Sequence, residues 1–174
     1  MNIWLTTDWH LGADDDLPKR PRGTSGKIMD RLGMALNPSD LLICLGDIMW
    51  NEYDYWSERL SHIECKKWLV IGNHDKKSVN WYMTHGWDWV GESFTLKMFG
   101  KTILFSHIPQ KDTGDFDVNI HGHFHAFGLD RVKEMEPEIH ARLTPKHHLI
   151  SLEELHFEPI RLQRVIELHE RTLK

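Results

Sequence analysis

Short apolar runs alternate along the chain with stretches in which apolar residues recur at helical spacing. The runs that predict buried strands are 2–7, 41–45, 68–71, 116–120 and 148–152. The stretches that predict helices are 27–36, 54–63, 76–85 and, at the C-terminal end, 161–173. Because strands separated by helices form right-handed crossovers, this order predicts an α/β sheet with a parallel core.

Two segments depart from this alternation. Phe94, Leu96 and Met98 alternate with polar residues, a Phe99-Gly100 turn follows, and 102–105 returns as an apolar run. This pattern predicts a β-hairpin, which would make the sheet mixed. Segment 131–146 is charged, contains two prolines and has no clean period, so we expect it to be irregular.

Composition restricts the class of protein. A chain of 174 residues with 40% hydrophobic and 27% charged residues is expected to form one folded domain, 1–174. No apolar run reaches the length of a membrane span and the N-terminus lacks a signal-peptide pattern, so we expect no membrane partner and a cytoplasmic location. Two cysteines without a C-x-x-C spacing predict plain thiols.

Charge and histidine content narrow the expected chemistry. The formal net charge of -5 argues against a broad basic surface for nucleic acid, although a local cationic site remains open. The 13 histidines are scattered rather than clustered in a tract. Since imidazole is the commonest metal ligand and titrates near neutrality, they indicate metal binding or proton transfer.

A restricted set of polar residues follows five of the apolar runs. These groups are Asp8-Trp9-His10, Gly46-Asp47, Gly72-Asn73-His74-Asp75, His107 and Gly122-His123-Phe124-His125. Ligands bind at the carboxyl ends of strands in open α/β sheets, so we expect these groups to meet. Residues two apart in an extended chain face the same way, so Asp8 with His10, and His123 with His125, are each expected to present two ligands to one point.

The donor set predicts two metal ions. The candidate ligands are oxygen and nitrogen atoms of Asp, His and Asn, with no Cys, and such a set suits Mn, Fe, Zn, Co or Ni. They are also too many for one tetrahedral ion. Two divalent metals can bind a phosphoryl group, hold a hydroxide and stabilise both ends of an in-line displacement. The sequence therefore predicts hydrolysis of a phosphate ester.

At these residues the sequence resembles the calcineurin-like metallophosphoesterase superfamily, whose ordered motifs are D-x-H, G-D, G-N-H-[DE], H and G-H-x-H. Its compact spacing is similar to that of the small single-domain bacterial and phage members. The resemblance implies a two-sheet α/β sandwich with mixed sheets flanked by helices. It also implies two divalent metals, with Mn expected. Their implied ligands are Asp8, His10, Asp47 and His125 for one ion, and Asp47, Asn73, His107 and His123 for the other.

The resemblance further implies that a hydroxide bridging the metals attacks phosphorus and that His74 is the general acid. One departure concerns the protein Ser/Thr phosphatase branch, which continues G-D-x-x-D-R-G where this chain has Gly46-Asp47-Ile48-Met49-Trp50-Asn51-Glu52. The Asp that orients the acid and the phosphate-binding Arg are missing. We therefore expect a phosphodiesterase. A phosphomonoesterase of the same mechanism and an inactive scaffold are the alternatives, and nucleotides and nucleic acids are candidate substrates.

Several neighbouring residues leave two interpretations open. Lys19, Arg20, Arg22 and Lys27 form a basic loop that either holds a phosphate or, as we favour, is solvated. Trp9, Trp50 and Phe124 either stack on a base or aryl leaving group or pack the walls of the site. His121 is expected to support a ligand or to pack. The remaining histidines, at 62, 85, 140, 147, 148, 156 and 169, are expected on the surface.

Overall fold

The computed structural model describes residues 1–14, 16 and 20–173, which fold into two sheets and six helices. The first sheet has the order β4 (Trp89–Gly91), β3 (Lys66–Val70), β2 (Leu41–Cys44), β1 (Ile3–Thr6) and β9 (Ile160–Arg161). The second has the order β5 (Ser93–Met98), β6 (Lys101–Ser106), β7 (Val118–His121) and β8 (His147–Leu149). The helices are α1 (Thr24–Ala35), α2 (Tyr53–Ser61), α3 (Val79–Thr84), α4 (Leu129–Met135), α5 (Pro137–His140) and α6 (Leu162–Thr172).

Both sheets are mixed. Strands β1 to β4 pair in parallel and β9 runs antiparallel to β1, whereas β5 and β6 form an antiparallel hairpin and β6, β7 and β8 pair in parallel. The predicted two-sheet α/β sandwich flanked by helices is therefore confirmed. The strand pattern alone led us to expect one mixed sheet. That was wrong, because the hairpin begins a second sheet instead of extending the first.

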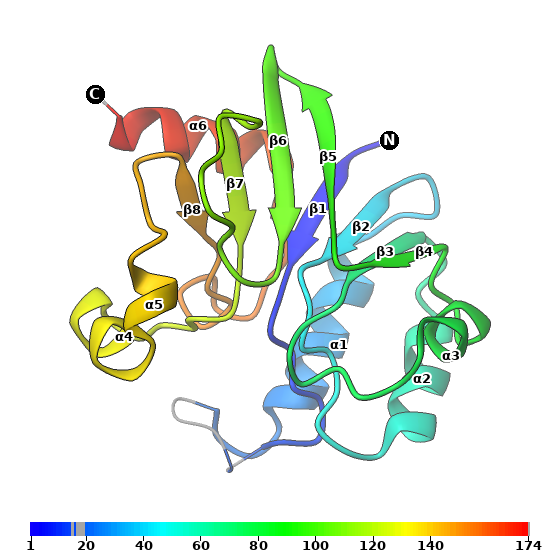
Figure 1. Cartoon of the computed structure of the whole chain (residues 1–174). Helices are drawn as coiled ribbons and strands as arrows, with labels where there is room; N and C mark the ends of the chain where they lie inside the picture. The colour runs from blue at the N-terminus through cyan, green and yellow to red at the C-terminus, as the bar shows by residue number, and fades with distance from the viewer. Residues whose placement is uncertain (15, 17–19, 174) are drawn as a thin grey trace.

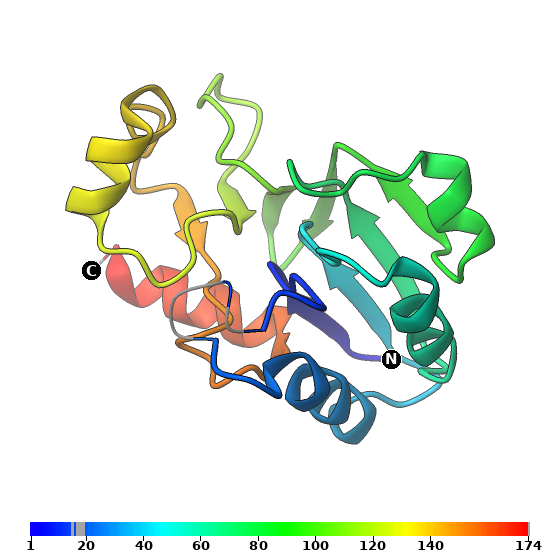
Figure 2. The same cartoon turned by 90° about the horizontal axis from the view of Figure 1, so that it is seen from below.

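Strand β2 shows why the apolar runs lack alternation. Leu41 and Ile43 belong to the core between the sheets, while Leu42 and Cys44 belong to the core beneath the helices. Successive side chains of a strand point to opposite faces, so a strand covered on both sides is apolar throughout. Figure 2 shows α1 lying on the side of the first sheet away from the second.

The C-terminal helix contributes to the core between the sheets. Its buried residues Leu162, Val165, Ile166 and His169 follow the spacing of one helical face. His169 was expected on the surface, and that expectation is wrong because its place on this face buries it. No helix in the described part of the chain is long and apolar enough to cross a bilayer.

Short elements account for the other differences from prediction. Segment 131–146 was expected to be irregular, but it contains most of α4 and all of α5. Strands β4 and β9 have three and two residues, too few to show a period. Helix α3 begins only after Ser78, whose side-chain Oγ accepts a hydrogen bond from the Trp81 amide at 3.2 Å. Such a cap satisfies an amide that has no partner within the helix.

The strand ends that carry the polar groups gather at one end of the molecule. The arrowheads of β1, β6 and β7 all point toward that end (Figure 1). Beyond these strand ends the chain continues in loops. These loops bear the candidate ligands.

Candidate metal centre

Main-chain hydrogen bonds hold the loops after β1 and β2 side by side. The Asp8 amide donates to the Gly46 carbonyl at 2.8 Å, and the His10 amide to the Asp47 carbonyl at 2.9 Å. The Asp75 carboxylate joins the loop after β3 to this pair. It accepts hydrogen bonds from the amides of Gly72 (2.8 Å), Asp47 (2.9 Å) and Ile48 (3.0 Å).

The predicted ligands have an unusual backbone conformation. Five of them have positive φ values: Asp8 (50°), His10 (44°), Asp47 (56°), His123 (75°) and His125 (48°). Non-glycine residues enter this region at a cost of roughly 1 kcal/mol or more, and such residues concentrate at functional sites. The surrounding hydrogen bonds therefore impose a shape on these loops that local preference disfavours.

Each aspartate uses one oxygen for structure and leaves the other facing the site. Asp8 Oδ2 accepts hydrogen bonds from Thr7 Oγ1 at 2.6 Å and the His123 amide at 3.0 Å, whereas buried Oδ1 has no hydrogen-bond partner within the described part of the chain. Asp47 Oδ1 accepts from the His74 amide at 2.8 Å, and Oδ2 faces two imidazoles. Each carboxylate thus presents one oxygen to the site, as a metal ligand requires.

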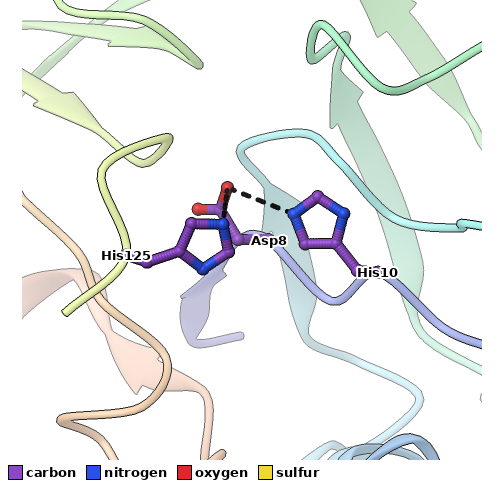
Figure 3. A group of neighbouring side chains, drawn as sticks. All are labelled: Asp8, His10 and His125. Atoms are coloured by element: carbon purple, nitrogen blue, oxygen red, sulfur yellow. Dashed lines mark ion pairs between the residues drawn. The ribbon is translucent and has the colours of Figure 1, made fainter. Parts of the chain in front are cut away.

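One group of donors consists of Asp8, His10 and His125, shown in Figure 3. Asp8 Oδ1 lies 3.9 Å from His10 Nε2 and 3.7 Å from His125 Nε2. The two imidazoles stack with ring centroids 5.1 Å apart. Asp47, outside this group, has its Oδ2 3.6 Å from His10 Nε2.

The second group lies around His107. Its Nε2 is 3.3 Å from Asp47 Oδ2, 2.8 Å from Asn73 Oδ1 and 3.3 Å from His123 Nδ1. Its Nδ1 contacts the Leu45 carbonyl at 2.7 Å, which fixes the ring with Nε2 toward the site. A third grouping, Asp8, Asp47 and His107, also has donor atoms within reach of one ion and is buried throughout.

The structure therefore brings all seven predicted ligands together but corrects one expectation about them. His123 and His125 were expected to face one point, as in an extended chain. Instead both have positive φ, and His123 faces Asn73 and His107 while His125 faces Asp8. The two rings belong to different donor groups.

The donor atoms fit divalent metal ions. Two ligand atoms each about 2.1 Å from one ion lie roughly 3–4 Å apart, as the His Nε2 and Asp Oδ atoms do here. Asp8 Oδ1 and both ring nitrogens of His10 are buried and have no hydrogen-bond partner among the residues that the structure describes. Burying polar atoms in this way is costly, and a bound cation would satisfy Asp8 Oδ1 and one nitrogen of His10.

The protonation states also fit ligation, with one competing proton. Burial lowers the pKa of His10 to about 4, which leaves the neutral ring that binds metals. Burial raises the pKa of Asp47, but contact with His107 outweighs it and lowers that pKa to about 2. Burial lowers the pKa of His107, but Asp47 and Asp8 raise it to about 9. A metal at His107 must therefore displace a proton.

His74 lies beside the donor groups without joining them. Its ring contacts Trp50 and His10, with centroids 4.9 Å and 5.3 Å apart. Within the described residues its imidazole makes ring contacts only, and no carboxylate hydrogen-bonds it. Trp50 therefore occupies a flank of the predicted general acid.

The three aromatic neighbours of the ligands differ in exposure. Trp9 and Phe124 are buried, and Trp9 packs on Trp87 with its Nε1 donating to Thr6 Oγ1 at 2.7 Å. Packing is therefore the role of both residues. Trp50 is 39% exposed, so its ring remains accessible to a substrate.

The predicted basic loop is not a uniform solvated segment. Arg22 and Lys27 are exposed, and Lys19 lies outside the described residues. Arg20, which we expected in solvent or on a phosphate, is buried and paired with Glu153. His121, expected to support a ligand or to pack, is buried and its ring contacts Phe124.

Two carboxylates at the site lie outside every motif. Glu136 contacts His123, and Glu153 contacts His125. Both follow the last predicted ligand in a part of the chain without metal-ligand spacing. No sequence pattern in this chain could have linked them to the histidines.

Comparison with known proteins places the chain in a family. Residues 1–159 match the family described as "Calcineurin-like phosphoesterase", to which the chain belongs. The predicted resemblance is thereby confirmed, and the family supports metal-dependent hydrolysis of phosphate esters. No curated protein matches the chain.

One solved structure shares the fold over nearly its whole length, and two others show weaker likenesses. A protein of unknown function from Aquifex aeolicus is 23% identical with a TM-score of 0.75, over 96% of this chain and 98% of that one. The nuclease MPE of Pseudomonas putida is 24% identical with a TM-score of 0.49, over 71% of this chain and 61% of its own. An archaeal phosphodiesterase is 17% identical with a TM-score of 0.45, over 74% and 77%.

Proposed function

We propose that this protein is a dinuclear-metal phosphodiesterase, with Mn²⁺ as its metal and His74 as general acid. The observation that carries the proposal is the position of Asp47. Its Oδ2 lies 3.6 Å from His10 Nε2 and 3.3 Å from His107 Nε2, so one oxygen faces both donor groups. That arrangement suits a carboxylate shared by two ions.

Two divalent cations, when bound, would neutralise phosphate charge and lower the pKa of a water molecule for attack on phosphorus. With Asp8 and Asp47 ionised, the site would keep a formal charge of about +2 for an anionic substrate. The chain holds these carboxylates in place through the Thr7, His74 and His123 donors described above.

His74 provides the proton for the leaving oxygen. Its amide is fixed on Asp47 Oδ1, and its ring is held against Trp50 beside His10. A ring N–H in that position can protonate an ester oxygen held at the metals. Trp50 also limits the access of water to this side of the ring.

The diester preference rests on the available cations. A monoester dianion needs more positive charge than a diester monoanion, and the phosphatase-type Arg after Gly46-Asp47 is absent. Arg20 cannot replace it, because its guanidinium is buried against Glu153 and the Asp8 and Trp9 carbonyls. The two metals would thus be the main counter-charge.

A matched substrate pair tests this function. Protein stripped with a chelator and reloaded with Mn²⁺ should hydrolyse bis(p-nitrophenyl) phosphate with a higher kcat/KM than p-nitrophenyl phosphate. A higher value for the monoester would instead identify a phosphomonoesterase. Loaded protein that hydrolyses neither ester, nor a panel of cyclic and nucleotide diesters, would be a scaffold.

Substitution of the shared carboxylate provides the second arm of the test. Asp47→Asn should lower metal affinity and kcat/KM by at least about 10- to 100-fold, because one neutral oxygen replaces a charged ligand. Asp54→Asn, an isosteric change at an exposed position on α2, is the matched control and should leave both unchanged. Equal behaviour of the two variants would refute the role of Asp47.

A further inference from the structure

Two carboxylates outside the motifs contact histidines of the donor groups from behind. Glu153 Oε1 lies 3.0 Å from His125 Nδ1, and Glu136 Oε2 lies 2.7 Å from His123 Nε2. In each ring the opposite nitrogen faces the site, 3.7 Å from Asp8 Oδ1 for His125 and 3.0 Å from Asn73 Oδ1 for His123. The carboxylates thus occupy the nitrogens that a metal would not use.

We propose that Glu153, held by Arg20, and Glu136 are positioning residues that orient His125 and His123 for metal binding. A carboxylate that accepts the outer N–H of a histidine fixes its tautomer and ring orientation and makes the inner nitrogen a better donor. The inference rests on the proposed function, because it assumes that these histidines bind metal. It adds residues that the family motifs leave out.

Glu153 is the more constrained of the two. Its side chain is 5% exposed, and Oε1 accepts hydrogen bonds from Arg20 Nε at 3.0 Å and Nη2 at 2.9 Å. Ser151 Oγ donates to Oε2 at 3.1 Å. With both oxygens occupied, the carboxylate has one orientation, and the His125 ring is aligned on it.

Arg20 extends this alignment to the other side of the donor group. Its guanidinium also donates to the carbonyls of Asp8 and Trp9. One buried ion pair therefore connects the His125 ring with the main chain that carries Asp8 and His10. Because desolvation largely offsets the attraction within a buried ion pair, we expect its main effect to be on position and not on net stability.

Glu136 makes the corresponding contact with His123, but its carboxylate is less constrained than that of Glu153. It lies between α4 and α5, where its amide donates to the Val132 carbonyl at 2.8 Å. Its side chain is 34% exposed, and His123 is its partner. Water can replace an exposed carboxylate more readily than a buried one, so its removal should cost less.

The test is titration of the chelator-stripped full chain with Mn²⁺ by calorimetry, together with the visible spectrum of the Co²⁺-loaded protein. Glu153→Gln should weaken Mn²⁺ binding about tenfold and Glu153→Ala up to about 100-fold. Glu136→Gln should have a smaller effect than Glu153→Gln. The Co²⁺ bands of Glu153→Gln should shift, because they report the geometry of the ligands.

Glu158→Gln is the matched control. Glu158 follows in the same segment, has a side chain that is 52% exposed and pairs with Arg31 of α1. It should bind Mn²⁺ as the wild type does. Glu153→Gln is isosteric and keeps an oxygen for Arg20, so it carries the test where the alanine variant does not fold.

Wild-type affinity and Co²⁺ spectra in Glu153→Gln, together with a lower Tm of its metal-free form, would make Glu153 a structural residue and overturn the proposal. An equal loss in Glu158→Gln would overturn it as well, because the effect would then be a general one of charge. Wild-type protein that binds neither Mn²⁺ nor Co²⁺ would overturn the proposed function along with it. Metal binding by the wild type, with affinity lost in the Glu153 and Glu136 variants but not in Glu158→Gln, supports the positioning role and the metal site of the proposed function.

Discussion

Replacing Gly122 with alanine should push a methyl group against a predicted metal ligand. An added Cβ would lie 2.5 Å from Asp8 Oδ2 and still closer to Thr7 Oγ1, whereas real Cβ atoms essentially never come within 3.0 Å. These two oxygens are hydrogen-bonded to each other at 2.6 Å, so neither can move without the other. The φ of Gly122 lies outside the left-handed region, and the clash is therefore the main effect.

The size of the effect follows from the required displacement. Asp8 Oδ2 must move by at least about 0.5 Å, and Oδ1, which faces the site, moves with it because both belong to one rigid carboxylate. Metal–ligand distances vary by only about 0.2 Å. We expect divalent metal affinity to fall at least about tenfold, as it does when a supporting contact of a ligand is lost. Overpacking should also lower the free energy of unfolding of the metal-free protein by about 1–3 kcal/mol.

Gly33→Ala is the matched comparison. Gly33 lies exposed in α1, and an added Cβ there has nothing within 4 Å. Alanine in a helix interior should raise the free energy of unfolding by about 0.5–1 kcal/mol and leave metal affinity unchanged. The same Gly→Ala change is thus expected to lower the free energy of unfolding at position 122 and to raise it at position 33.

Calorimetric titration with Mn²⁺ and urea unfolding in the presence of a chelator measure the two quantities separately. Wild-type Mn²⁺ affinity in Gly122→Ala would refute the assignment of Asp8 as a ligand held by this close packing. Equal losses of stability in Gly122→Ala and Gly33→Ala would refute the steric argument.

Three further predictions concern individual side chains. His74→Gln should keep both metals and lose about 10²- to 10⁴-fold in rate on an alkyl diester but little on a p-nitrophenyl diester, since only the alkoxide needs a proton; equal losses contradict this. Trp50→Ala should raise KM about tenfold for a nucleoside diester but not for a dialkyl diester, because its 39% exposed ring offers a stacking surface, and unchanged KM values exclude such stacking. Partial burial and nearby His169 lower the pKa of His148 from 6.5 to about 4. Between these two pH values the imidazole is therefore protonated in the unfolded chain and neutral in the folded chain. The free energy of unfolding should then fall by about 2 kcal/mol more in the wild type than in His148→Gln between pH 7 and pH 4, and identical urea-unfolding profiles would disprove it.

Prediction from the sequence succeeded where the signal is local. Buried strands such as β2 need apolar residues on both faces, and this leaves an uninterrupted run in the sequence. Polar residues at the ends of such runs, among them Asp8 and Asp47, can be expected to meet because parallel strands of one sheet end at the same edge. His107 follows a strand of the second sheet, so the packing of the two sheets brings it to them. The structure brings them together, although their binding of metal stays a prediction.

Elements shorter than a period of the pattern gave no signal. Strands β4 and β9 are formed through pairing with strands distant in sequence, not through their own propensities. The hairpin joins the second sheet for the same reason, because β6 pairs with β7 and not with a strand of the first sheet. A period of two marks a strand but does not specify which strands it joins.

The sequence by itself therefore determined which residues meet at the strand ends, because that information lies in apolar runs and the residues that follow them. Tertiary structure alone decided how those residues point and what supports them. Positive φ values direct His123 and His125 to different groups, against the expectation for an extended chain. Burial of Arg20 is compensated by Glu153, distant in sequence, which pairs with its charge, and by the Asp8 and Trp9 carbonyls, which accept its other N–H groups. Pairing of this kind depends on through-space distance, which no local pattern of residues records.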